Sequence, residues 1–113
     1  MLPREYRLRR STEFATVVRS GARARCRHLV LHQQPSVRRD LPAIGLVVGR
    51  SVGGSVVRHR VSRRLRAQLA LRLNTVPQGS GLVVRALPGA AQATSAELGA
   101  DLDAALSRLA RRP

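Results

Sequence analysis

This chain of 113 residues carries 21 basic and six acidic residues, and its formal net charge is +15. All of the basic residues are arginines, and the single cysteine, Cys26, excludes an intramolecular disulfide and a cysteine-based metal site. No apolar run approaches the roughly 18 residues of a membrane-spanning helix, and the basic start lacks the apolar segment of a secretory signal. The length predicts one domain over residues 1–113. The lack of a spanning helix and of a secretory signal predicts a cytoplasmic protein, and the charge predicts that its partner is a nucleic acid or another acidic surface.

The start of the chain divides into an arm and a helix. Residues 1–10 are basic and contain little that could pack, so we expect a flexible arm that becomes ordered on contact with nucleic acid. A helix should follow over residues 11–20, because Ser11 suits its N-cap. Phe14 and Val18 stand four residues apart and therefore share one face of this helix. An apolar face on a short helix is usually buried, so a core role for Phe14 remains as good an interpretation as a ligand contact.

Three segments, residues 23–34, 43–50 and 81–87, have the patterns of β-strands. The first segment alternates, and one of its faces consists of His28, Val30 and His32. The second also alternates, and one of its faces is nearly bare: Gly45, Val47 and Gly49. A bare strand face suits the close approach of a ligand or of another backbone; crowding by a neighbouring helix is the alternative.

The most basic segment of the chain is also predicted to be helical. Its apolar residues return every four positions and form a stripe: Val57, Val61, Leu65, Leu69 and Leu73. Five arginines fall within residues 58–66, and no acidic residue lies between Asp40 and Glu97. These arginines therefore repel one another, and a polyanion would relieve that repulsion. The helical angle places a group of them on one arc away from the stripe: Arg60, Arg63 and Arg64. A merely solvated basic face is the alternative interpretation.

Two glycines precede this helix, and a last helix closes the chain. Gly53 and Gly54 can bring backbone N–H groups close to an anion at the helix start. The last helix is predicted to begin with a capping box formed by Thr94 and Glu97. The resulting order is α-β-β-(β)-α-β-α, a single small α+β domain with a central sheet. The strand–helix–strand unit over residues 43–87 is long enough for a parallel crossover, which the general rule makes right-handed.

The basic helix resembles the signature helix of the bacterial ribonuclease P protein subunit, whose pattern reads Val-Gly-Asn-Ala-Val-x-Arg-Asn-Arg-x-Lys-Arg. The residues that match are Val52, Gly53, Val56, Arg58, Arg60 and Arg63. The residues that depart from the pattern are Gly54, His59 and Ser62. The resemblance extends in order and spacing over residues 7–87.

This resemblance implies a fold like the second domain of ribosomal protein S5, with a left-handed βαβ crossover in place of the usual one. It implies that the protein binds the catalytic RNA subunit, one protein per RNA, and contacts precursor tRNA during removal of its 5′ leader. The RNA-binding residues would then be Arg50, Arg58, His59, Arg60, Arg63, Arg64 and Arg66. The cleft for the single-stranded leader would be lined by Phe14, Val18, His28, Val30, His32 and Val47.

No hydrolytic centre is apparent in the sequence. The few acids are scattered, and Asp101 and Asp103 stand two apart on a helix, where they do not face each other. His28 and His32 have no nearby acid or cysteine that would complete a metal site. The resemblance agrees, since it implies that the RNA subunit binds the Mg²⁺ ions and performs the hydrolysis.

Two other classes of protein share some of these features. A small basic ribosomal protein would have the same composition, although the ordered match of segments favours the ribonuclease P family. A DNA-binding helix-turn-helix protein would require a second helix close to the basic one. Strand patterns on both sides of the basic helix argue against that class.

Overall fold

The structure, a computed structural model, describes residues 2–8, 11–34 and 41–111. A four-stranded mixed sheet lies at its centre, in the order β1-β2-β4-β3. The strands are β1 (Ala22–Arg25), β2 (Leu29–Gln34), β3 (Ala43–Val47) and β4 (Gly81–Ala86). β2 pairs antiparallel with β1 and β4, whereas β3 and β4 run parallel. The predicted α+β class is confirmed.

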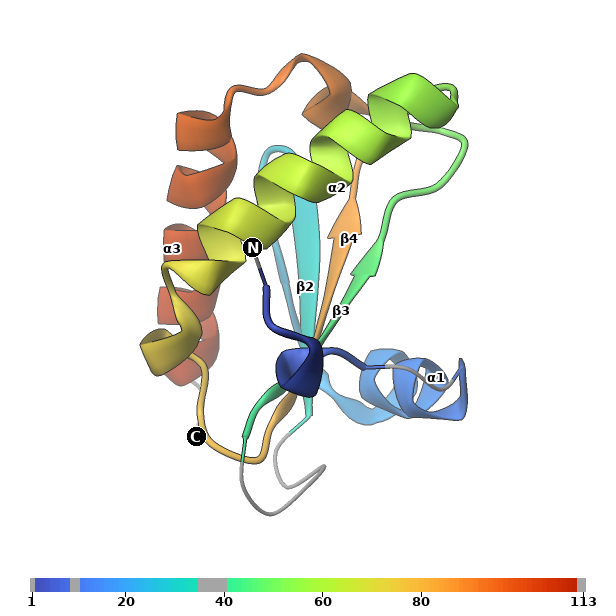
Figure 1. The fold of residues 1–113 in the computed structure, drawn as a ribbon. Coiled ribbons are helices and arrows are strands. Elements are labelled where there is room, and N and C mark those ends of the chain that lie inside the picture. The colour runs from blue at the N-terminus through green and yellow to red at the C-terminus, as the bar shows by residue number, and fades with distance from the viewer. Residues whose placement is uncertain (1, 9–10, 35–40, 112–113) are drawn as a thin grey trace.

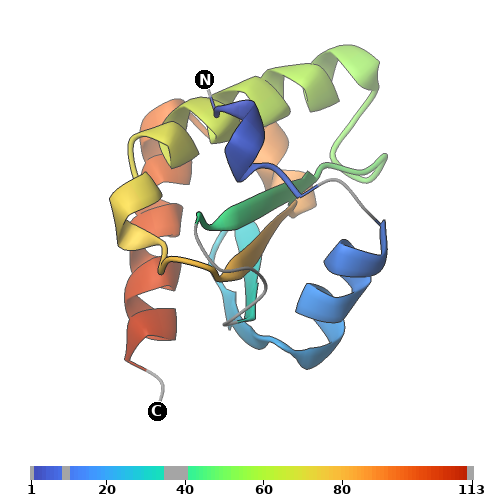
Figure 2. The same cartoon turned by 60° about the horizontal axis from the view of Figure 1, so that its bottom comes forward.

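Helices cover the two faces of the sheet unequally. α2 (Ser55–Ala70) and α3 (Ser95–Ala110) pack on one face, and α1 (Ser11–Ser20) lies on the other (Figures 1 and 2). Three short 3-10 turns complete the described elements: η1 (Arg4–Tyr6), η2 (Leu73–Thr75) and η3 (Pro88–Gln92).

The larger core lies between the sheet and the pair α2 and α3. The apolar stripe of α2, whose members are spaced four residues apart, faces the core. Its middle three members, Val61, Leu65 and Leu69, are fully buried. α3 contributes its own stripe, in which Leu98 and Leu102 are fully buried. Its predicted capping box is confirmed, because Thr94 and Glu97 each accept a hydrogen bond from the other's backbone N–H.

The crossover from β3 through α2 to β4 has the less common hand. With α2 in front of the sheet, as in Figure 1, β4 lies to the left of β3, and the two strands are parallel neighbours. This arrangement is a left-handed βαβ unit, the hand that the family resemblance implied and that the general rule disfavours.

The N-terminal segment packs more closely than its composition suggested. Leu2 and Leu8 are 2% and 7% exposed, respectively. The Leu8 N–H donates to the Ile44 carbonyl over 2.8 Å, so the segment adds to the edge of β3. The position of residues 2–8 thus rests on two leucines among the arginines that find apolar partners, and the flexibility of the arm before contact with nucleic acid stays a prediction. Residues 1, 9 and 10 of that expected arm lie outside the described residues.

The predicted strand over residues 23–34 is a hairpin of two strands, β1 and β2. A tight turn joins them, with the Cys26 N–H donating to the Leu29 carbonyl over 2.8 Å. The strict alternation therefore holds from Leu29 onward but not across residues 26–28. This interruption decides where the His28 side chain goes.

Candidate nucleic-acid interface

The start of α2 presents uncapped backbone N–H groups. Its N-cap is Gly54, which has no side chain to accept a hydrogen bond from the first turn. The preceding Gly53 has a φ of 156°, and a Cβ there would lie 2.9 Å from the Cβ of Val57. Glycine is thus required for the chain to enter the helix in this way. The result is an exposed positive end of the helix dipole, which favours an anion.

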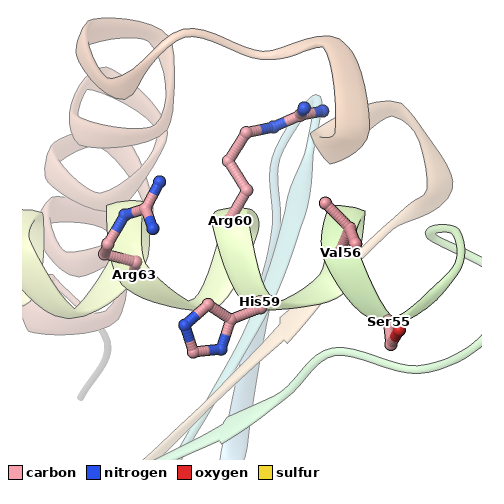
Figure 3. Close-up of a pocket in the computed structure, with 5 residues that line it drawn as sticks. All are labelled: Ser55, Val56, His59, Arg60 and Arg63. Carbon is pink, nitrogen blue, oxygen red and sulfur yellow. The ribbon is translucent and has the colours of Figure 1, made fainter.

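A surface hollow of about 530 Å³ lies along the first two turns of α2. It is lined by Ser55, Val56, His59, Arg60 and Arg63 (Figure 3). Val56 is 79% exposed, so this basic hollow also contains an apolar surface. Such a combination suits a phosphate backbone with its sugars or bases, because both charged and apolar atoms find partners.

Two arginines of α2 are turned toward η3 and the residues that follow it. Arg60 Nη2 donates to the Ala91 carbonyl over 3.1 Å, and Arg64 Nη1 donates to the Ala93 carbonyl over 2.7 Å. Figure 3 shows Arg60 extending from α2 toward this segment. Arg60 and Arg64 therefore attach the η3 segment to α2. The helical angle placed them on the same arc as Arg63, but it could not show that they contact η3.

The other predicted α2 residues remain available to a partner. Arg63 and His59 are exposed, and Arg58 and Arg66 are half-buried. Arg50 is exposed in the loop before the helix. The ion pairs found in the described part of the chain involve none of these residues. The outer side of α2 thus carries uncompensated positive charge.

On the opposite side of the sheet, α1 packs through two side chains. Val17 is fully buried against a small cluster that includes Ala43 and Val83. Phe14 is half-buried and lies over β3, where a Cβ on Gly45 would come within 2.3 Å of its ring. The bare face of β3 is therefore occupied by Phe14, and only glycine permits this contact.

The strand registers define two rows of side chains on this α1 face. The first row crosses the sheet in the order Arg23, His32, Val83 and Gly45. The second row crosses it in the order Arg25, Val30, Arg85 and Val47. α1 packs on the first row at Val83 and Gly45. In the second row Val47 is 37% exposed and Arg85 is exposed, so that row is open at the surface.

His32 forms part of the floor between the arginines. It is 4% exposed, and its Nε2 has no hydrogen-bond partner. Burial lowers the pKa of His32, and the positive charges of Arg85 and Arg23 lower it further. The imidazole is accordingly neutral at neutral pH, and the charge on this face comes from the arginines.

The acidic residues of α3 are engaged in structural contacts. Asp101 holds His28, and Asp103 Oδ1 accepts from Arg72 Nε over 2.6 Å, which lowers the pKa of Asp103. Hydrogen bonds from the Thr94 backbone and side chain lower the pKa of Glu97. Across residues 2–8, 11–34 and 41–111, no three His, Cys, Asp or Glu side chains gather where they could hold a metal ion. In the same part of the chain, no helix is long and apolar enough to cross a membrane.

Comparison with known proteins identifies the family. The ribonuclease P family model matches residues 2–110. The chain belongs to the ribonuclease P protein family. The ribonuclease P protein component of Mycobacterium sp. (strain KMS) is 54% identical over 110 residues, covering 96% of this chain and 92% of the relative. That of Acidothermus cellulolyticus is 51% identical over 110 residues, with the same coverage of both chains.

Solved structures of the family have the same fold. The RNase P protein of Staphylococcus aureus superposes with a TM-score of 0.81 at 20% identity, covering 94% of this chain and 95% of that one. The RNase P protein of Thermotoga maritima gives a TM-score of 0.79 at 21% identity, covering 90% and 96%. The fold is thus shared although four residues in five differ.

Five of the six residues assigned to the leader cleft from the ribonuclease P resemblance lie on or beside the α1 face. Val30, His32 and Val47 belong to its rows, Phe14 lies over Gly45, and Val18 is 42% exposed on α1. His28 does not join them. Its Nδ1 lies 3.0 Å from Asp101 Oδ2 on α3, and its backbone N–H donates to the same oxygen over 2.8 Å. The turn at residues 26–28 directs His28 to the other side of the sheet, so its assignment to the cleft is withdrawn.

The sequence interpretation overlooked three arginines on this face, Arg23, Arg25 and Arg85. A signal for them was present, since Ala22 and Ala24 flank Arg23 and the alternation puts alanines and arginines on opposite faces. The strand register is what brings β1 and β4 arginines to the same row.

Proposed function

We propose that this chain is the protein subunit of ribonuclease P, a ribonucleoprotein endonuclease whose catalytic centre lies in its RNA. The observation that carries the proposal is the charge of α2, on which Arg58, Arg63 and Arg66 have no ion-pair partner within the described chain. Charges held this way are suited to RNA phosphates, and the uncapped helix start adds a further positive group. On this proposal α2, with Arg50 and His59, binds the catalytic RNA.

The α1 face is proposed to receive the 5′ leader of precursor tRNA. Phe14 and Val18 form a wall, and the strand residues Val30, His32 and Val47 form a floor. Phe14 is the only phenylalanine of the chain and the His32 ring is only 4% exposed, so base stacking on this face depends mainly on Phe14. The protein contributes binding and orientation of the substrate, and it lowers the repulsion between two RNA molecules.

The Mg²⁺ ions are assigned to the catalytic RNA, where they would stabilise the attacking and leaving oxygens of phosphodiester hydrolysis. We place one protein on each RNA, in the cytoplasm, where precursor tRNA is processed. A role as a ribosomal protein is not favoured, because the ribonuclease P family model matches nearly the whole chain.

A cleavage assay tests this proposal. Precursor tRNA is incubated with the catalytic RNA at low Mg²⁺ concentration, with and without the protein. The protein should accelerate removal of the leader and tighten the binding of the precursor. Equal rates with and without saturating protein, at every Mg²⁺ concentration, would refute the proposal.

A further inference from the structure

Three arginines on the α1 face have no role in the fold that the described contacts reveal. Ala24 lies in the larger core and Ala22 packs against it, so the alternating Arg23 and Arg25 point to the opposite face. Arg85 is placed in the same way, because Val84 and Ala86 on either side of it belong to that core. All three arginines are exposed.

The strand registers place these arginines around two buried side chains. Arg25 and Arg85 are the two cross-strand neighbours of Val30, and Arg23 is the neighbour of His32. Val30 is 4% exposed although it belongs to neither apolar cluster. The aliphatic stems of its arginine neighbours flank it, which leaves their guanidinium groups at the surface.

The backbone spacing of the three arginines suits binding along a phosphate backbone. Arg23 and Arg25 are two residues apart on β1, about 7 Å along the strand, and Arg85 lies two strands away, about 10 Å across the sheet. No ion pair found within the described chain engages any of them. Arg23 is the direct cross-strand neighbour of His32, and Arg85 stands two residues along β4 from Val83, the neighbour of His32 on its other side, so all three lie on the same face of the sheet.

The shape of this surface favours an extended single strand over a duplex. α1 stands on the same face and covers the first row at Val83 and Gly45. The strip beside α1 is four strands across, about 15 Å. A single strand can lie along such a strip with its phosphates over the guanidinium groups.

We propose that Arg23, Arg25 and Arg85 bind the phosphates of the single-stranded 5′ leader and supply much of its affinity. This inference rests on the proposed function. It extends that function by adding charge-based recognition of the leader backbone to a cleft in which Phe14 is the main accessible ring. Arginines that contact phosphates do not read bases, so the recognition applies to leaders of different sequence.

The test uses the reconstituted holoenzyme with precursor tRNA and mature tRNA. In the variant Arg25→Gln/Arg85→Gln, affinity for the precursor should fall by about 10-fold or more, since two charge-assisted contacts are lost. Affinity for mature tRNA should not change. The slope of log affinity against log salt should become shallower by about 1.4 for the precursor alone, or about 2 when Arg23→Gln is added.

A charge-matched control separates a local contact from a general loss of positive charge. Arg27 and Arg111 are exposed and lie off the α1 face, in the hairpin turn and after α3. The control variant Arg27→Gln/Arg111→Gln should keep the ratio of precursor to mature tRNA affinity. An equal fall in that ratio for both double variants would overturn the proposal.

Leaders with neutral methylphosphonate linkages complete the test. Neutralising the leader should weaken binding to the wild-type holoenzyme and have little further effect in Arg25→Gln/Arg85→Gln. Fully additive losses would mean that the arginines and the leader phosphates do not meet, and would overturn the inference while leaving the proposed function intact. A wild-type protein without any preference for the precursor over mature tRNA would instead contradict the leader-binding part of the proposed function.

Discussion

The two basic surfaces of this protein, the outer side of α2 and the α1 face of the sheet, are built differently. On α2 the arginines are close together on one helix. Two of them, Arg60 and Arg64, donate hydrogen bonds to the carbonyls of Ala91 and Ala93. On the sheet Arg85 is far in sequence from Arg23 and Arg25, and it comes close to them only through strand pairing. Charge density along the chain is therefore a poor measure of which arginines are free to bind RNA.

The contrast also concerns shape. The start of α2 is a projecting element with a hollow along its first two turns, suited to the backbone of a folded RNA. The α1 face is a strip of sheet bounded by α1, suited to an extended strand. If α2 binds the catalytic RNA and the α1 face binds the leader, changes on the two surfaces should have different effects.

Binding of the catalytic RNA should depend steeply on salt. If six to ten phosphates are neutralised, the affinity should fall by about 10³–10⁵ between 50 and 200 mM salt. The measurement is a filter-binding or fluorescence titration at four salt concentrations. An affinity that does not change with salt would mean that the charge of α2 lies outside the interface with the catalytic RNA. The assignment of that RNA to α2 would then be wrong.

The two sets of α2 arginines should separate affinity from stability. The variant Arg58→Ala/Arg63→Ala/Arg66→Ala should weaken binding of the catalytic RNA by about 100-fold or more, while the protein remains folded at the assay temperature. The variant Arg60→Ala/Arg64→Ala should instead lose about 1–3 kcal/mol of folding stability, because η3 is no longer attached. Calorimetry and RNA titration on both variants give the answer, and an exchange of the two phenotypes would refute the assignment.

Phe14 should act on the leader rather than on the tRNA body. Phe14→Leu keeps an apolar side chain over Gly45 and should cost less than about 1.5 kcal/mol of stability. It removes the ring, so the ratio of precursor to mature tRNA affinity should fall by about 5–150-fold. If stability falls strongly while the ratio stays constant, Phe14 is a core residue and the cleft lies elsewhere.

The smallest effect concerns the pH dependence of stability. The pKa of His32 is lowered in the folded protein by burial and by the charges of Arg85 and Arg23. Below about pH 6.5 the His32 imidazole is therefore protonated in the unfolded chain while it is still neutral in the folded chain. Stability should therefore decrease as the pH falls from about 6.5 toward the lowered value. His32→Gln should flatten this part of the profile in melting experiments between pH 5 and 8. The exposed His59 provides the control, since His59→Gln should leave the His32-dependent slope in place.

Much of the fold could be predicted from the chain because it rests on local periodicity. The stripe of Val61, Leu65 and Leu69, the capping box of Thr94 and Glu97, and the alternation in β2 and β3 are all short-range patterns. A helix or strand with one apolar side has to bury that side, so these patterns determined the elements and which of their faces turn inward.

The sequence by itself also indicated a polyanionic partner, since a charge of +15 with few acids leaves most of the arginines without an acidic residue to pair with. Only the tertiary structure decided which arginines are free, because the carbonyls that receive Arg60 and Arg64 lie about 30 residues away. It also decided the hand of the crossover and the burial of Leu2. His28 shows the reason: one turn in the hairpin sends it to Asp101, 73 residues further along the chain, a contact that no local pattern encodes.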